Sequence, residues 1–188
     1  KIQEYDLKLH LINREKKLGL GSAYCEGFNW AINNNFDYII QMDADLSHNP
    51  DDILRLLEKN DKGDVIIGSR YKTGVNVVNW PLRRLILSYL ANIYARIITG
   101  VNVHDLTSGF KCIKVEVLKN ININKIKSEG YSFQIEVNFL AWNNRFKVGE
   151  VPIIFYDRTV GKSKMSKKII WEAIFIVPKL ALKRFFRL

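Results

Sequence analysis

The chain of 188 residues is long enough for one domain with a sizeable core, and its 47% hydrophobic and 26% charged residues are ordinary for a folded protein. Its only cysteines, Cys25 and Cys112, exclude a disulfide-built scaffold and fit a reducing, cytosolic compartment. No apolar run reaches the ~20 residues of a membrane-spanning helix, and the net charge of +10 favours partners that carry phosphate.

Strands alternate with helices through the first part of the chain. We expect strands at 9–12, 36–42 and 64–68, and helices at 22–33 and from residue 49 onward. The second helix has Asn49 as a capping residue, Pro50 in its first position, and the carboxylates of Asp51 and Asp52 in its first turn. This alternation predicts an α/β layer with a largely parallel sheet.

The second part of the chain is predicted to hold longer helices. We expect helices at 82–99, 130–142 and 167–187, and strands at 110–113 and 147–155. The helix at 82–99 carries an apolar stripe at four-residue spacing, formed by Leu85, Tyr89, Ile93 and Ile97. Because a proline cannot donate a ladder hydrogen bond, Pro152 predicts that its strand is an edge strand or contains a bulge.

Two carboxylates one residue apart follow the strand at 36–42, in the string Met42-Asp43-Ala44-Asp45-Leu46-Ser47-His48. Carboxylates at the end of a buried strand cost free energy unless a positive charge meets them, and a hard divalent cation carrying a phosphorylated substrate is the natural candidate. Asp45 is expected to ligate the metal, and Asp43 to hold the nucleotide ribose or a second metal position. The alternatives are a plain acidic surface turn and, for His48, a packing or capping role. No Cys and His cluster surrounds the pair, which argues against tetrahedral zinc.

Basic side chains follow the next strand and begin the next helix. Arg70, in Gly68-Ser69-Arg70-Tyr71, lies where ligands gather in an open α/β sheet and can grip a phosphate with two hydrogen bonds. Arg83 and Arg84 lie at a helix start, with Ser88 after them, and helix N-termini also favour phosphate. The alternative for Arg70 is an ordinary surface ion pair.

Two loops carry further ligand-binding chemistry. The loop Asp105-Leu106-Thr107-Ser108-Gly109-Phe110 combines hydroxyls with a glycine, which permits close approach of a ligand but is also common in plain turns. The segment from Asp157 to Met165 contains Gly161 among basic residues, which predicts a lid over a phosphorylated substrate or a flexible basic surface loop.

Taken in chain order, these strings resemble the dolichyl-phosphate (polyprenol-phosphate) mannose synthases among the family 2 glycosyltransferases. The matching strings cover nearly the whole chain: Gly19-Leu20-Gly21-Ser22-Ala23-Tyr24, Met42 to His48, Gly68 to Tyr71, Leu106 to Phe110, Gly130-Tyr131-Ser132-Phe133-Gln134, Glu150-Val151-Pro152-Ile153, and Asp157-Arg158 through Ser163-Lys164. The ordered set is specific, whereas each string alone is not.

The resemblance implies a GT-A (Rossmann-like) α/β fold and transfer of mannose from GDP-mannose to dolichyl or polyprenyl phosphate. The transfer would be a metal-dependent, inverting single displacement that uses Mg²⁺ or Mn²⁺. The site residues implied by the resemblance fall into four groups: catalytic Asp45, Arg70 and Arg83; nucleotide-sugar-binding Asp43, Ala44, Asp45, Arg158 and Lys164; acceptor-phosphate-binding Arg70, Arg83 and Ser88; and metal-binding Asp43, Asp45 and Ser47. Ser47 lies where some relatives carry a glutamine that ligates the metal.

One departure from the family pattern concerns the start of the domain. Members of the family begin with a Pro-Thr-Tyr-Asn-Glu-like loop and an Asp-Asp-Gly-Ser segment that hold the nucleotide, and neither occurs in these 188 residues. We therefore expect an N-terminally truncated domain at 1–166, in which the 188 residues alone bind GDP-mannose weakly or not at all.

The C-terminal segment 167–188 is expected to be a basic amphipathic helix that lies in a membrane interface. Of the net charge, +7 lies between Lys162 and Leu188, where eight basic residues stand against Glu172 alone. Its apolar residues are Ile169, Ile170, Trp171, Ile174, Phe175 and Ile176. We expect peripheral attachment to the cytoplasmic face of a membrane and no nucleic-acid partner; a solvated helix face is the alternative.

Four other functions stay open on the sequence alone. A sister transferase would use UDP-glucose or another activated sugar. A nucleic-acid-binding module would use the basic tail but leaves the Asp43–Asp45 pair without a role. An aspartate-nucleophile phosphatase also places Asp-x-Asp after a strand, but continues into Thr or Val, whereas Leu46 and Ser47 follow here. The fourth is an inactive, truncated remnant of a glycosyltransferase.

Overall fold

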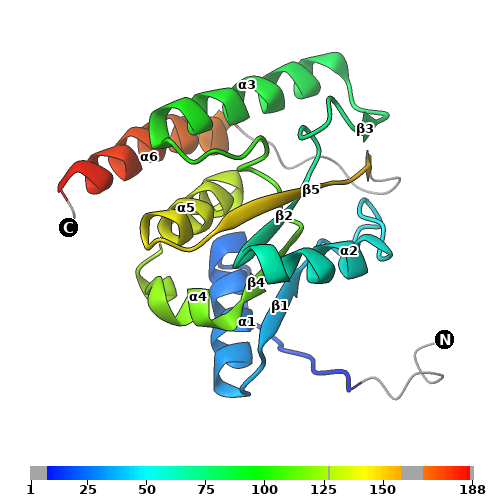
Figure 1. The fold of residues 1–188 in the computed structure, drawn as a ribbon, viewed down its shortest axis with the longest axis vertical. Coiled ribbons are helices and arrows are strands. Elements are labelled where there is room, and N and C mark those ends of the chain that lie inside the picture. Colours follow the sequence, from blue (N-terminus) through cyan, green and yellow to red (C-terminus); the bar gives the residue numbers. More distant parts are fainter. Residues whose placement is uncertain (1–7, 127, 158–166, 187–188) are drawn as a thin grey trace.

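The computed structural model describes residues 8–126, 128–157 and 167–186 (Figure 1). Within 167–186, side chains are described only for residues 171–184. A four-stranded mixed sheet forms its centre, in the order β1 (Tyr38–Gln41), β4 (Lys111–Lys114), β2 (Val65–Ser69), β5 (Val148–Pro152). A second sheet pairs the short parallel strands β3 (Val77–Val78) and β6 (Phe155–Tyr156).

The directions of the strands correct the expected largely parallel sheet. β1, β2 and β5 run the same way, but β4 lies between β1 and β2 and is antiparallel to both. Two of the three neighbouring pairings in the central sheet are thus antiparallel. An apolar run predicts a strand but not its direction, so the sequence pattern could not reveal this insertion. Pro152 ends β5, which is an edge strand as predicted.

Helices cover both faces of the central sheet. The six helices in the described residues are α1 (Leu20–Asn33), α2 (Asp52–Glu58), α3 (Leu82–Thr99), α4 (Val115–Asn120), α5 (Gly130–Asn143) and α6 (Lys167–Phe186). Side chains of β2 alternate between the two faces: Val65 and Ile67 pack in the larger core with α1, α4 and α5, whereas Ile66 packs with Leu56 of α2. Short 3₁₀ helices follow α2 (Lys59–Lys62) and α4 (Ile123–Lys125).

Most predicted elements are present, but the first strand is not. Residues 9–12 have no regular structure in the described part of the chain, and the side chains of Leu9 and Leu11 are each 79% exposed. Alternating apolar residues form a strand only where a neighbouring strand satisfies the backbone, and the described residues supply none to this segment. α2 begins at Asp52 rather than Asn49, although the Asn49 side chain accepts a hydrogen bond from the Asp51 N–H.

The apolar stripe of α3 faces away from the core. Tyr89 and Ile93 are exposed and Ile97 is 70% exposed, while Asn92, Ala95 and Thr99 make the buried side of the helix. Periodicity located the stripe but not the side on which the sheet lies, because the buried side of α3 is small and polar. Exposed apolar residues therefore cover the outer side of α3, at Leu82, Ile86, Tyr89, Leu90, Ile93 and Ile97.

α6 packs on the domain beside α3 and α5 (Figure 1). Its Val177 and Leu180 are buried in the larger core, the Tyr94 hydroxyl of α3 donates to the Ile174 carbonyl, and the Glu129 N–H donates to the Glu172 carboxylate. Four other apolar side chains in the described part of α6 remain exposed: Trp171, Ile174, Phe175 and Leu182. None of the helices in the described ranges combines the length and apolar character needed to cross a membrane.

Candidate active site

Three loops meet at one edge of the central sheet. β1 and β2 end at Gln41 and Ser69, and antiparallel β4 begins between them at Lys111. The residues after β1, those after β2 and those before β4 therefore lie together. They lie beyond the carboxyl ends of β1 and β2, where α/β sheets commonly bind ligands. The topology thus gathers the segments 42–48, 70–71 and 105–110, which were picked out separately in the sequence.

The carboxylates of Asp43 and Asp45 are held by neighbouring hydroxyls. The Tyr24 hydroxyl of α1 donates to Asp43 Oδ1 at 3.2 Å. Burial raises the pKa of Tyr24, and the charge of Asp43 raises it further, so the hydroxyl keeps its proton and remains a donor. The Ser47 N–H and hydroxyl both donate to Asp45 Oδ1, which fixes the turn between strand and helix.

Asp43 and Asp45 suit Mg²⁺ or Mn²⁺ better than a metal that needs a complete protein cage. Within the described ranges, no group of three or more His, Cys, Asp or Glu side chains gathers around one point. Magnesium-type ions often take one or two protein carboxylates together with water and substrate phosphates, so this pair is compatible with them. Ser47 is 1% exposed and turned to Asp45, a geometry that argues against it as a ligand.

The two carboxylates line a cleft of about 820 Å³ between the sheet edge and the starts of α1 and α5. Thr107 and Gly109 of the loop at 105–110 also line the cleft, as that loop's hydroxyls and glycine suggest. The other lining residues were not named as site residues from the sequence: Arg14, Lys17, Tyr24, Glu129, Tyr131 and Gln134. The Glu129 carboxylate accepts the Gly21 N–H at 2.7 Å, and a Cβ on Gly19 would clash with this carboxylate. Gly19, whose φ is 108°, therefore lets the loop approach Glu129 closely.

Arg70 is buried in an ion pair rather than open to solvent. Its Nε and Nη2 donate to the two carboxylate oxygens of Asp105, each at 2.7 Å, and Nη2 also donates to Thr107 Oγ1. Burial lowers the pKa of the Arg70 guanidinium, but the Asp105 carboxylate outweighs it, so the net shift is upward and Arg70 stays charged. Both side chains are at most 5% exposed, which corrects the alternative of a surface ion pair.

The structure separates the two arginines at the start of α3. Arg83 is exposed and does not line the cleft of Asp43 and Asp45, whereas the side chain of Arg84 is largely buried and donates to Asp157 Oδ1 at 2.7 Å. The Arg84 guanidinium also lies 4.0 Å from the centre of the Trp80 ring. Ser88, one turn after Arg84, accepts a hydrogen bond from the Tyr71 hydroxyl. The geometry points to Arg84, not Arg83, as the partner of Ser88.

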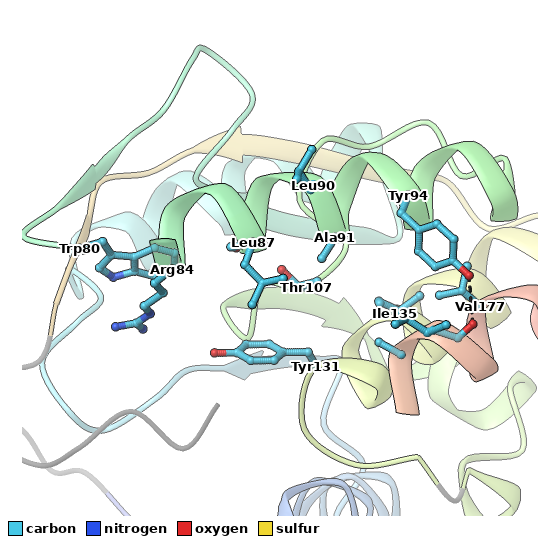
Figure 2. A pocket seen from close by; sticks show the side chains of 13 residues that line it. Trp80, Arg84, Leu87, Leu90, Ala91, Tyr94, Thr107, Tyr131, Ile135 and Val177 are labelled. Atoms are coloured by element: carbon cyan, nitrogen blue, oxygen red, sulfur yellow. Dashed lines mark hydrogen bonds between the residues drawn. The ribbon is translucent and has the colours of Figure 1, made fainter. Parts of the chain in front are cut away.

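Arg84 and Ser88 lie in an apolar groove of about 240 Å³ between α3, α5 and α6 (Figure 2). Apart from Arg84, Ser88 and Thr107, its lining is aromatic or aliphatic: Trp80, Leu87, Leu90, Ala91, Tyr94, Tyr131, Ile135, Ala173, Ile174 and Val177. Leu90 and Ile174, which line it, are also partly exposed to solvent, at 55% and 42%. The groove therefore combines an apolar trough with one cationic, hydroxyl-bearing end.

Other residues of interest fall inside the core or outside the described ranges. His48 packs against the rings of Phe110 and Phe155 and is 6% exposed, and burial lowers its pKa, so the packing role is confirmed. Lys111, fully buried, donates to Asn138 Oδ1 at 3.0 Å. Arg158 and Lys164, expected to contact the nucleotide diphosphate, lie outside the described residues, as does the rest of the predicted lid after Asp157.

Comparison with known proteins gives one family match. The family model described as glycosyl transferase family 2 matches residues 1–121. The chain is 45% identical over 177 residues to the polyprenol monophosphomannose synthase of Mycolicibacterium smegmatis, covering 94% of this chain and 67% of that protein. It is 39% identical to the undecaprenyl-phosphate mannosyltransferase of Micrococcus luteus, covering 94% of this chain and 73% of that protein.

Proposed function

The chain belongs to glycosyl transferase family 2, as an enzyme with the expected GT-A type of α/β fold, and from that premise we propose that it transfers mannose from GDP-mannose to the phosphate of a polyprenyl or dolichyl lipid. The observation that carries the proposal is the apolar groove with Arg84 and Ser88 at one end, directly beside a cleft with paired carboxylates. A lipid phosphate needs both an apolar channel and a cationic end. The names of the two similar proteins agree with this choice of acceptor and sugar.

The acceptor supplies its own nucleophile in this reaction. A phosphate monoester is largely ionised at neutral pH, since its second pKa is ~6, so its oxygen can attack the sugar without a strong general base. Arg84 would bind the phosphate as a charge-assisted hydrogen-bond donor, and the Ser88 hydroxyl, which already accepts from Tyr71, can donate its own hydrogen. Both arginines are ion-paired, but Asp105 and Thr107 occupy both Nε and Nη2 of the buried Arg70. Arg84 has an ion pair through Nη1 to Asp157, and its Nε has no partner in the described residues, so Arg70 would shape this end of the site rather than bind the phosphate first.

The donor would occupy the cleft lined by Asp43, Ala44 and Asp45. Its diphosphate would lie near the two carboxylates, which would hold Mg²⁺ or Mn²⁺, while Arg14 and Lys17 add positive charge at the cleft. The bound ion would offset the negative charge that develops on the departing GDP. Catalysis then consists of alignment and electrostatic stabilisation, and attack from the groove side opposite the leaving group inverts the anomeric carbon.

The exposed apolar residues of α3 and α6 suggest where the lipid comes from. Leu90 and Ile174 border the groove, and Trp171 and Phe175 continue the apolar surface of α6, with the exposed basic Lys179 one turn after Phe175. We propose that α3 and α6 lie in the interface of an anionic membrane at its cytoplasmic face, with the groove open to the lipid. Protein partners and nucleic acid form no part of this proposal.

The proposal is tested by incubating the protein with radiolabelled GDP-mannose, Mg²⁺ and a short polyprenyl phosphate. We expect a lipid-linked mannose that is stable to mild alkali and labile to acid, as a glycosyl phosphodiester is. The polyprenol without its phosphate should give no product. UDP-glucose is the matched donor control. Product from UDP-glucose alone would establish the sister transferase instead, and no product from either donor would favour an inactive protein.

A further inference from the structure

The donor cleft and the acceptor groove share two lining residues, Thr107 and Tyr131. In Figure 2 Tyr131 lies at the floor of the groove, with its hydroxyl directed towards the end where Trp80 and Arg84 lie. A transfer between two bound molecules requires the reacting atoms to come within about 3–3.5 Å of each other. The bond to the sugar must therefore form beside these two side chains.

The Thr107 hydroxyl has no capacity left for a substrate. A hydroxyl has one hydrogen and two lone pairs. Thr107 Oγ1 accepts from Arg70 Nη2 at 2.9 Å and from Asn92 Nδ2 at 3.0 Å, and donates to Asp105 Oδ1 at 3.2 Å. Its N–H donates to Asn92 Oδ1. Thr107 is thus a fixed part of the Arg70–Asp105 network.

Tyr131 is the other boundary residue, and its hydroxyl is uncommitted. Within the described ranges it has no hydrogen-bond partner, in contrast to Tyr24, Tyr71 and Tyr94, which all donate to other groups. Tyr131 lies in the first turn of α5, whose following residues Phe133 and Ile135 are buried in the larger core. A rigid helix therefore holds the ring in place between the two cavities.

We propose that Tyr131 contacts the acceptor phosphate where the cavities meet, its hydroxyl donating a hydrogen bond to a phosphate oxygen and its ring excluding water from the sugar. This inference rests on the proposed function. The bond that forms joins an acceptor phosphate oxygen to the anomeric carbon, and the bond that breaks joins that carbon to the diphosphate oxygen of the donor. GDP leaves with the electron pair, and Tyr131 keeps its proton throughout.

The two parts of Tyr131 have separable consequences. Loss of the hydroxyl removes one hydrogen bond to a charged group and should weaken acceptor binding. Loss of the ring opens the boundary, so that water competes with the lipid phosphate for the sugar. The readouts are the dissociation constant and KM of the acceptor for the first effect, and the ratio of free mannose to lipid-linked mannose for the second.

The experiment compares the natural protein with Tyr131→Phe, Tyr131→Ala and the control Tyr38→Phe, which changes an exposed tyrosine of β1. Binding of citronellyl phosphate, without donor, is followed by tryptophan fluorescence because Trp80 lines the groove. We expect Tyr131→Phe to raise the dissociation constant and the acceptor KM about tenfold, as for one charge-assisted hydrogen bond, with kcat changed less. Citronellol, which lacks the phosphate, should bind the natural protein and Tyr131→Phe with equal affinity.

Tyr131→Ala should in addition raise the ratio of free to lipid-linked mannose several-fold. Equal acceptor affinity for Tyr131→Phe and the natural protein would overturn the inference, and so would failure of the natural protein to bind citronellyl phosphate. Tyr131-dependent binding without mannosyl transfer would sustain the inference and reject the proposed donor. Transfer that is unchanged by Tyr131→Phe would reject the inference alone.

Discussion

Arg70 and Asp105 form a buried ion pair with two hydrogen bonds of 2.7 Å, and the Asp105 carboxylate also accepts the Arg70 N–H. Asp105 is in turn held by Glu150, which accepts the N–H groups of His104 and Asp105. The pair thus joins the end of β2, the loop before β4 and the edge strand β5. Its first consequence concerns stability, because neither charge has water to replace its partner.

Asp105→Ala should lower the free energy of unfolding by about 3–5 kcal/mol, since it leaves a buried guanidinium unpaired. Urea denaturation followed by circular dichroism measures this loss. Glu26→Ala is the matched control, because Glu26 pairs with Arg14 at 3.0 Å but is 45% exposed, and such pairs contribute under ~1 kcal/mol. Similar losses in the two variants would contradict the structural role of the buried pair.

The neighbours Arg83 and Arg84 provide a matched test of the acceptor site. Arg84→Gln should raise the acceptor KM by tenfold or more, because Arg84 lies in the groove beside Trp80 and Ser88. Arg83→Gln should leave KM within about twofold, since that side chain is exposed. Steady-state kinetics with a short polyprenyl phosphate distinguishes the two, and the reverse order would restore Arg83 as the phosphate ligand.

Asp45→Asn should reduce turnover more than tenfold, a loss of over ~1.4 kcal/mol of transition-state stabilisation. The reason is that the substitution removes one of the two carboxylate charges, Asp43 and Asp45, that would hold the metal ion. EDTA should likewise abolish turnover of the natural protein, and added Mg²⁺ or Mn²⁺ should restore it. Asp61→Asn, at an exposed position of the 3₁₀ helix after α2, is the control and should have no effect. An Asp45→Asn variant that keeps a tenth of the natural activity would argue against the metal role.

Lys111 makes the stability of the protein depend on pH. Burial lowers the pKa of Lys111 from 10.5 to about 7, so between these values the unfolded chain holds a proton that the folded chain lacks. Stability therefore rises with pH through that window, by at most about 1.4 kcal/mol per pH unit, and the destabilisation by Lys111 is greatest at and below pH 7.

Lys111→Met should remove this dependence. The difference in unfolding free energy between the variant and the natural protein should favour the variant most near pH 7 and shrink towards pH 10. Urea denaturation at pH 6, 8 and 9.5 provides the comparison. A difference that stays constant across these pH values would show that the folded-state pKa of Lys111 is close to that of the unfolded chain.

The outer surface of α6 should control attachment to membranes. The double variant Trp171→Ser and Phe175→Ser should lose co-sedimentation with anionic vesicles at low salt, because both side chains are exposed, at 59% and 70%. Leu54→Ser, which removes a 66% exposed apolar residue from α2, should bind as the natural protein does. Failure of the natural protein itself to co-sediment would reject the proposed interfacial position.

Local sequence signals predict where the helices and strands lie better than they predict which of them pair or pack together. The strands predicted at 36–42 and 64–68 and the helices predicted at 82–99 and 130–142 lie within two residues of β1, β2, α3 and α5, because apolar runs and periodicity mark them. The antiparallel insertion of β4 does not, because strand direction depends on long-range connections. The outward stripe of α3 was ambiguous for a related reason: an apolar side of a helix can face a core or a lipid surface, and composition does not distinguish them.

The site shows the same division. Asp43 and Asp45 were predicted because two carboxylates at a strand end need a cation, but Arg83 was chosen over Arg84 although only Arg84 precedes Ser88 by one turn. That four-residue spacing was a usable signal. Tyr24, Asp105 and Tyr131 lie in strings that the sequence singles out, but their individual roles arise from contacts with residues 19 and 35 positions away or from the meeting of two cavities.

The place of β4 also sets the order in which the protein can assemble. Gln41 of β1 and Ile67 of β2 both pair with Lys111, and β1 has no other strand beside it in the described residues. During synthesis, the carboxylates after β1 and the arginine after β2 therefore stay unaligned until the ribosome has released the chain beyond Lys114. Nascent chains that end before this point lack the centre of the sheet, and its closure over long sequence separations favours slow folding.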